Sequence, residues 1–102
     1  MMTILPLKTV LEPGPDKQVD SLFNGPRRRI VQITLRNGAK LERHVASVPI
    51  TIQCLSGSGI FGIEGRESPL TPGVFVTLEA NVPHEVTAEP AVSILLTQFT
   101  GG

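Results

Sequence analysis

Aromatic side chains are scarce in this sequence of 102 residues, which has no tryptophan, no tyrosine and only four phenylalanines. Few residues are therefore available to build the stacking platforms that bind single-stranded nucleic acid. A single cysteine, Cys54, excludes an internal disulfide and fits a reducing compartment, so we expect a cytoplasmic protein. Apolar runs stay far below the roughly 18 residues of a membrane-spanning helix. The first residues have no basic segment before an apolar one, so we expect neither a membrane partner nor a signal peptide.

The charges cancel overall but are unevenly placed along the chain. Nine basic and nine acidic residues give a formal net charge of zero. Residues 1–45 carry eight of the basic and four of the acidic groups, whereas residues 46–102 carry one basic and five acidic groups. Only the segment PRRRI at 26–30 has the charge density of a nucleic-acid contact. Three arginines entering a strand are more often a solvated edge or a salt-bridged subunit contact, so we expect no nucleic-acid partner.

From residue 30 onward the apolar residues recur with a period of two, which predicts strands and not helices. In the first strand the apolar face consists of Val31, Ile33 and Leu35, and the opposite, polar face of Gln32, Thr34 and Arg36. The turn pair Asn37-Gly38 follows. Further strands are expected at KLERHV, PITIQCL, IFGI, VFVTL, HEVTA and VSILLTQF, with turns that include SGSG at 56–59 and EP at 89–90. This spacing predicts an all-β sandwich or barrel with at least six strands between residues 28 and 99 and no helix longer than two turns.

The first 25 residues have a different character. Residues 4–11 fit an edge strand, and residues 19–23 fit a single helical turn closed by Asn24-Gly25. We therefore divide the chain into an N-terminal arm, residues 1–25, and a β-barrel domain, residues 26–102. The arm has too few residues for a core of its own, so we expect it to pack on the barrel or on a partner subunit.

The two histidines of the chain, His44 and His84, stand in a spacing that resembles a known family. A glycine precedes the first histidine by six residues, and a Pro-Gly turn, a short strand and a proline precede the second. Across roughly residues 30–98 this resembles the cupin superfamily, whose small single-domain members are RmlC-like jelly rolls. The positions that agree with the family's two motifs are Gly38, His44, Gly57, Gly73 and His84. The resemblance implies an all-β double-stranded β-helix, also called a jelly-roll barrel.

The same resemblance implies a metal site of three histidines and one glutamate, of which only half is present. The second histidine of the first motif falls on Ala46 and the glutamate falls on Ile50. In the second motif, Glu79, Asn81 and Ala88 replace proline, glycine and asparagine. His44 and His84 alone would hold a divalent metal such as zinc, nickel, manganese or iron only weakly, so we expect no resident metal cofactor.

Three other side chains are candidate substitute ligands. Gln53 is nearer to position 50 than Cys54 is, but it lies on the opposite strand face unless a bulge intervenes. Cys54 shares a strand face with position 50 but lies four residues away, about 13 Å along an extended strand. Cys54 is therefore interpreted as a small apolar core residue. Glu42 shares a face with His44 in a regular strand and is the nearest substitute.

With Ala46 and Ile50 in place of ligands, the predicted cup becomes mainly apolar. We expect a ligand-binding site formed by His44, His84, Ile50, Ile52 and Val86, with the two imidazoles pointing into one cavity. A collapsed core is the alternative for a chain of this size. Pro83 fixes its own φ and favours an extended Val82, so a strand should begin at His84.

Three functions are compatible with these features. The first is a non-enzymatic module that binds a small molecule in the barrel, and the missing ligands favour it. The second is a metal-dependent enzyme of the dioxygenase or isomerase type that works with a reduced ligand set. The third is a structural protein whose dimer is the functional form. Jelly-roll sheets leave apolar outer faces and edges, and two-fold dimers are the commonest oligomers, so we expect a homodimer.

Overall fold

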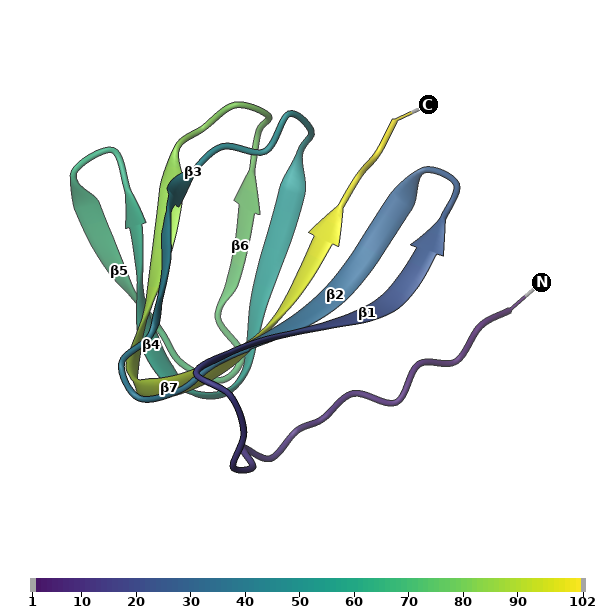
Figure 1. Ribbon diagram of the computed structural model, residues 1–102. Coiled ribbons are helices and arrows are strands. Elements are labelled where there is room, and N and C mark those ends of the chain that lie inside the picture. The colour runs from purple at the N-terminus through teal and green to yellow at the C-terminus, as the bar shows by residue number, and fades with distance from the viewer. Residues whose placement is uncertain (1, 102) are drawn as a thin grey trace.

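Seven β-strands and no helix make up the described part of the chain, residues 2–101 of the computed structural model (Figure 1). The strands are β1 (Lys17–Gly25), β2 (Arg28–Leu35), β3 (Lys40–His44), β4 (Ile50–Ile63), β5 (Arg66–Leu70), β6 (Phe75–Leu78) and β7 (His84–Gln98). Six of them, β2 to β7, lie between residues 28 and 99, which confirms the all-β prediction. Within residues 2–101 nothing forms a helix that could cross a membrane.

The strands form one continuous antiparallel sheet that folds back on itself. Its order is β1-β2-β7-β4-β5, with β3 added to β7 and β6 added to β4. The two long strands β4 and β7 pair from Ile50 opposite Gln98 to Ile63 opposite His84. Figure 1 shows both strands running along one wall of a U, bending at its base and rising in the other wall. One wall therefore contains β1, β2 and β6, and the other contains β3 and β5.

The bends of β4 and β7 occur where the sequence predicts turns. Residues 56–59 are not a turn, because β4 continues through them with shifts of register at Cys54/Ser56 and Gly57/Gly59. Residues 89–90 likewise lie inside β7. Gly57 adopts a φ of +76° at the bend, a conformation that glycine reaches without steric cost. Predicting two short strands on either side of each bend was therefore wrong, since the glycine and proline residues bend the strands without ending them.

The space between the two walls is filled by aliphatic side chains. Among residues 2–101 the buried core contains 14 residues, including Leu35, Val86, Val92 and Ile94, each 0% exposed. Their period-two positions are those that the sequence assigns to an inner face. Burial of a Leu, Ile or Val side chain contributes about 1.5–3 kcal/mol relative to exposure, so this face fixes the register of the strands.

Residues 2–16, the part of the N-terminal arm that precedes β1 and the only part called the arm from here on, lie across the outer face of β2, on the side opposite the core (Figure 1). The backbone of Lys8 exchanges two hydrogen bonds with the Gln32 amide, at 3.1 and 2.7 Å. Farther along, the Arg36 guanidinium donates to the carbonyl oxygens of Glu12 and Pro15, both at 2.7 Å. The alternating polar face of β2 therefore holds the arm. Because the arm covers it, Gln32 is only 1% exposed.

Two details predicted for the first 25 residues are wrong. Residues 4–11 form no strand, because their backbone lies over the face of the sheet and not beside its edge. Residues 19–23 form no helical turn, because β1 pairs with β2 from Lys17 opposite Leu35 to Gly25 opposite Arg28. Pairing with a complete neighbouring strand outweighs the weak local preference of a five-residue segment.

Replacing Gly57 by alanine should destabilise the protein more than the same change at Gly65. Both glycines have positive φ, at 76° and 75°, so both variants carry the same backbone strain. Around Gly65 there is open space, whereas a Cβ at Gly57 would collide with the Ala91 carbonyl and approach a Leu11 methyl group to 2.8 Å. We expect Gly65→Ala to lower the free energy of unfolding by about 1 kcal/mol and Gly57→Ala by about 2–4 kcal/mol. Urea unfolding measures both, and equal losses would contradict the close packing at the bend.

Candidate functional site

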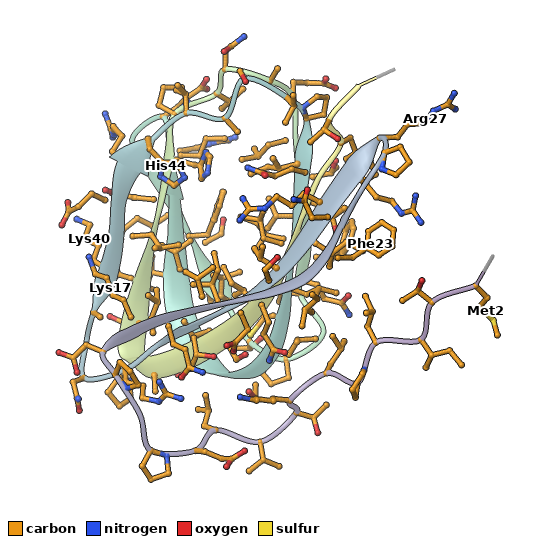
Figure 2. The ribbon with its side chains drawn as sticks, turned by 45° about the vertical axis from the view of Figure 1, so that its right-hand side comes forward. Met2, Lys17, Phe23, Arg27, Lys40 and His44 are labelled. Atoms are coloured by element: carbon orange, nitrogen blue, oxygen red, sulfur yellow. The ribbon has the colours of Figure 1, made fainter. Side chains whose placement is uncertain are left out.

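Strand pairing brings the two histidines together at the end of the barrel. His84 is the first residue of β7, as the preceding proline predicts, and His44 is the last residue of β3. The two residues are direct partners in the β3–β7 register. Figure 2 shows His44 on the inner side of the barrel end. The predicted placement on neighbouring strands, facing each other, is confirmed.

A bulge in β3 sets the orientation of His44. Leu41 pairs with Val86 and His44 pairs with His84, so three residues of β3 advance against two residues of β7. The extra residue turns His44 to the same face as Leu41, which packs against the core. The parity argument that grouped Glu42 with His44 therefore fails. Glu42 is exposed, and it contributes its backbone carbonyl and not its carboxylate to the site.

The two imidazoles are in contact but differ in environment. Their ring centroids lie 4.3 Å apart with an interplanar angle of 57°. His84 is 2% exposed and stacks on Phe61, with ring centroids 6.1 Å apart and an angle of 17°. His44 is exposed. One imidazole is thus held inside the protein, while the other reaches from it towards solvent.

Hydrogen bonds to backbone carbonyls fix both rings in the same tautomer. The Nδ1 atom of His44 lies 2.8 Å from the carbonyl oxygen of Glu42, and Nδ1 of His84 lies 2.9 Å from that of Val82. A carbonyl oxygen only accepts, so each Nδ1 carries the proton and donates it. In the neutral rings both Nε2 atoms are consequently free acceptors. The Nε2 atom of His84 is buried and has no hydrogen-bond partner within residues 2–101.

An unpartnered buried acceptor is unusual, because burying a polar group without a hydrogen bond costs about 1–3 kcal/mol. Functional sites are among the places where such groups persist, since a ligand can supply the missing donor. The adjacent loops are apolar: Ala46, Val48 and Val82 are partly buried against the core. A backbone hydrogen bond of 2.7 Å from Asn81 to Ala46 joins the two loops.

The predicted apolar lining is buried and comes from both walls. Val86 is 0% exposed and follows His84 on the same face of β7. Ile50 and Ile52 are 2% and 1% exposed and pair with Gln98 and Leu96, in the opposite wall. All three belong to the packed core.

Phe61 is the neighbour that the sequence reasoning missed. It is opposite Val86 in the β4–β7 register, on the face that carries His84. The alternation of the sequence predicts which face of the strand carries Phe61. Only the pairing register of β4 with β7 shows that the Phe61 ring stacks on the His84 imidazole.

The side chains around the pair do not fit a three-ligand metal centre. Within the described residues no group of three or more histidine, cysteine, aspartate or glutamate side chains is close enough to hold one ion. Ala46 and Ile50 offer no donor atom. Cys54 is 1% exposed, its thiol points to the carbonyl of Ser56 at 3.7 Å, and burial raises the pKa of this thiol, which disfavours the thiolate. Two imidazoles form at most a weak divalent-metal site.

Comparison with known proteins identifies the fold. No protein-family model matches the sequence, and no curated protein matches it. A cupin superfamily protein from Desulfitobacterium hafniense superposes with a TM-score of 0.82 and 12% identity, covering 90% of this chain and 84% of that chain. An RmlC-like cupin with a double-stranded β-helix from Methanocaldococcus jannaschii gives a TM-score of 0.79 and 16% identity over 96% of this chain and 90% of that chain. The chain has the cupin fold, as its sequence predicts.

A solved enzyme also shares this fold. Salicylate 1,2-dioxygenase from Pseudoaminobacter salicylatoxidans, in a structure of its adducts with gentisate, matches with a TM-score of 0.78 and 18% identity. The match covers 84% of this chain but only 25% of the dioxygenase.

Lowering the pH should destabilise the fold through His84. Burial lowers the pKa of His84 below its ordinary value, and this effect outweighs the hydrogen bond to Val82, which raises it; the nearby His44 lowers it further. Between that lowered pKa and about 6.5, the unfolded chain binds more protons than the folded one. The free energy of unfolding is therefore highest above about pH 6.5 and falls as the pH drops through this interval.

Urea unfolding between about pH 7.5 and 5 measures this effect, above the range where most carboxylates titrate. His84→Phe, which retains an aromatic ring beside Phe61 but cannot titrate, should lose most of the pH dependence. The matched variant His44→Gln should retain it, because burial is the largest cause of the shift at His84. An unchanged pH dependence in His84→Phe would contradict the assignment.

Proposed function

We propose that this protein is a non-enzymatic binding module that holds a small molecule at the end of the cupin barrel, with His44 and His84 as its polar anchors. The observation that carries the proposal is the pair of Nε2 acceptors, one of them buried without a partner. Two adjacent acceptors fixed by backbone hydrogen bonds are preorganised to receive a donor.

The chemistry of the pair defines the class of ligand. Because each Nδ1–H donates to a backbone carbonyl, the acceptor that each ring offers in its neutral form is Nε2, so the ligand should present a hydroxyl or N–H group. The lowered pKa of His84 keeps this ring neutral near pH 7, which favours a donor over an anion. The Phe61 ring and the apolar loops around Ala46 and Val82 favour an apolar body next to the donor. A weakly acidic or neutral compound of this kind, such as a phenol, matches both requirements.

A metal-dependent enzyme of the dioxygenase or isomerase type is the alternative function. The specific observation in its favour is the fold shared with salicylate 1,2-dioxygenase, of which this chain spans a quarter. The donor set argues against it, because Ala46 and Ile50 supply no ligand to complete the two imidazoles.

A second copy of the chain is the proposed protein partner. Along the arm, Leu5 and Leu7 are half-buried, whereas Met2 and Ile4 are 79% and 78% exposed. The arm thus has an apolar outer side as well as an apolar inner side. The outer face of the sheet, on which the arm lies, also carries Phe75, which is 59% exposed. Cross-strand pairs connect the two places, in the order Gln32, Leu95, Gln53 and Phe75. Exposed apolar side chains on the arm and at Phe75 therefore lie on the same side of the sheet, which favours a homodimer with an isologous interface.

Phenol should bind at the histidine pair, and alanine at either histidine should weaken it. Each lost hydrogen bond between neutral groups is worth about 0.5–1.5 kcal/mol, which corresponds to about two- to thirteenfold in affinity. An NMR titration of the 15N-labelled protein measures the affinity and locates the shifts. His44→Ala should leave the stability nearly unchanged because His44 is exposed, whereas His84→Ala also opens a buried gap beside Phe61.

Benzene serves as the matched control ligand, since it lacks the hydroxyl group. Equal binding of benzene and phenol, or phenol shifts that ignore both substitutions, would contradict the proposed donor site. Elemental analysis of protein purified without a metal-affinity tag tests the alternative. Stoichiometric iron, manganese, nickel or zinc would favour the enzyme.

Light scattering at micromolar concentration should give twice the chain mass of 10.9 kDa. Ile4→Glu should shift the protein to monomers, because it places a charge on the outer side of the arm. Val45→Glu is the matched control: Val45 is also an exposed apolar residue, at 53%, but it adjoins His44 at the end of the barrel. A monomer in the unsubstituted protein, or equal dissociation by both substitutions, would rule out this interface.

A further inference from the structure

A bulge in β1 turns the Phe23 side chain out of the barrel. Ser21 pairs with Val31 on the core face, and a regular strand would return Phe23 to that face two residues later. The register shifts between these residues, so that Phe23 lies opposite Ile30 on the outer face. Bulges that re-aim a side chain recur beside functional sites.

The hairpin that joins β1 to β2 holds the Phe23 ring in place. The ring lies so close to Gly25 that a Cβ there would collide with it and displace it. The Arg28 guanidinium lies over the ring, 4.5 Å from its centroid, in a cation–π contact. Both the ring and the charge are therefore positioned before anything binds.

A groove of about 360 Å³ lies between this hairpin and the arm. Its lining residues are Thr3 and Leu5 from the arm and Phe23, Pro26, Arg28 and Ile30 from the hairpin. Figure 2 shows Phe23 projecting from the hairpin towards the side on which the arm carries Met2. The volume lies within the range of about 300–1,000 Å³ that is usual for small-molecule sites.

The charge around the groove has one sign. Among the described residues of its lining Arg28 alone is charged, and Arg27 and Arg29 flank it in the sequence of the hairpin. The two salt bridges found among residues 2–101 are Lys8–Asp20 and Lys40–Glu85, so no carboxylate of the described chain neutralises Arg28. A guanidinium beside an apolar wall is suited to a ligand with an apolar body and a carboxylate head.

We propose that this groove, defined by Leu5, Phe23, Arg28 and Ile30, is a second binding site that takes an amphipathic organic monocarboxylate. The carboxylate accepts hydrogen bonds from Arg28, and the apolar body lies between Leu5 and Ile30. The groove is on the outer face of β1 and β2, whereas the histidine pair is on the inner face of β3 and β7. The proposal is therefore independent of the function proposed for the histidines.

Hexanoate is the probe, and NMR titration of the 15N-labelled full chain is the measurement. Hexanoate should shift the amide signals of residues 3–5, 23–26 and 28–30, and 1-hexanol, of equal chain length but uncharged, should bind more weakly. Arg28→Gln removes the charge and should weaken hexanoate binding about tenfold or more, since hydrogen bonds to charged groups contribute more than neutral ones. Added salt should weaken it as well, because the groove is open to solvent.

Arg27→Gln is the matched control, because Arg27 belongs to the same turn but does not line the groove. Arg27→Gln should change hexanoate affinity by less than about threefold, because it alters only the long-range charge. Equal effects of the two substitutions, equal binding of 1-hexanol, or shifts confined to the histidine pair would overturn the proposal. So would a failure of hexanoate to bind, combined with dissociation of a dimer by Arg28→Gln, because a second copy would then occupy the groove.

Discussion

The pairing of β4 with β7 is the constraint on which the rest of the structure depends. These two strands stay in register from Ile50 opposite Gln98 to Ile63 opposite His84, and every other strand except β1 adds to one of them. Their common bend divides one sheet into two walls, and the side chains between the walls form the core. The same pairing puts His84 at the far end of the barrel, where β3 brings His44 to it. The position of the histidine pair therefore follows from the place where the β4–β7 pairing ends.

The two faces of the sheet have separate roles. The inner face is mainly aliphatic, and at the barrel end it carries the two imidazoles beside Phe61. The outer face of β2 is polar, yet Gln32 and Thr34 are buried there, at 1% and 6% exposure, because the arm covers them. Side-chain and backbone hydrogen bonds from Gln32 and Arg36 fix the arm, and the arm in turn forms one wall of the groove beside Phe23. The polar outer face of β2 would be solvated without the arm. By holding the arm, this face helps to form the groove beside Phe23.

Much of the fold could be predicted from the sequence because strand periodicity is a local property. The alternation in residues 30–36 and the turn pair Asn37-Gly38 specify β2 and its end. The bends at Gly57 and at residues 89–90 could not be told from turns, since glycine and proline occur in both. The strand β1 was missed because VDSLF has no pattern of its own and becomes a strand only through its pairing with β2.

For the candidate site, sequence predicted the two histidines and their pairing but not their chemistry. The bulge that turns His44 inward, the carbonyls that receive both Nδ1–H groups and the stacking of His84 on Phe61 depend on backbone geometry. Ile50 and Ile52 are on the inner face, as the alternation predicts, but their place in the wall opposite the histidines follows from the bend in β4, which the sequence alone does not reveal.

The central claim is that both imidazoles present a bare Nε2 acceptor. Two-bond 1H–15N correlation spectra of the histidine rings near pH 7.5 test it most directly, because the ring nitrogen shifts distinguish the tautomers. The geometry predicts that His84 is a neutral ring protonated at Nδ1, and that addition of phenol shifts its Nε2 resonance. A His84 ring protonated at Nε2, or an Nε2 resonance that stays unchanged when phenol binds elsewhere, would contradict the account.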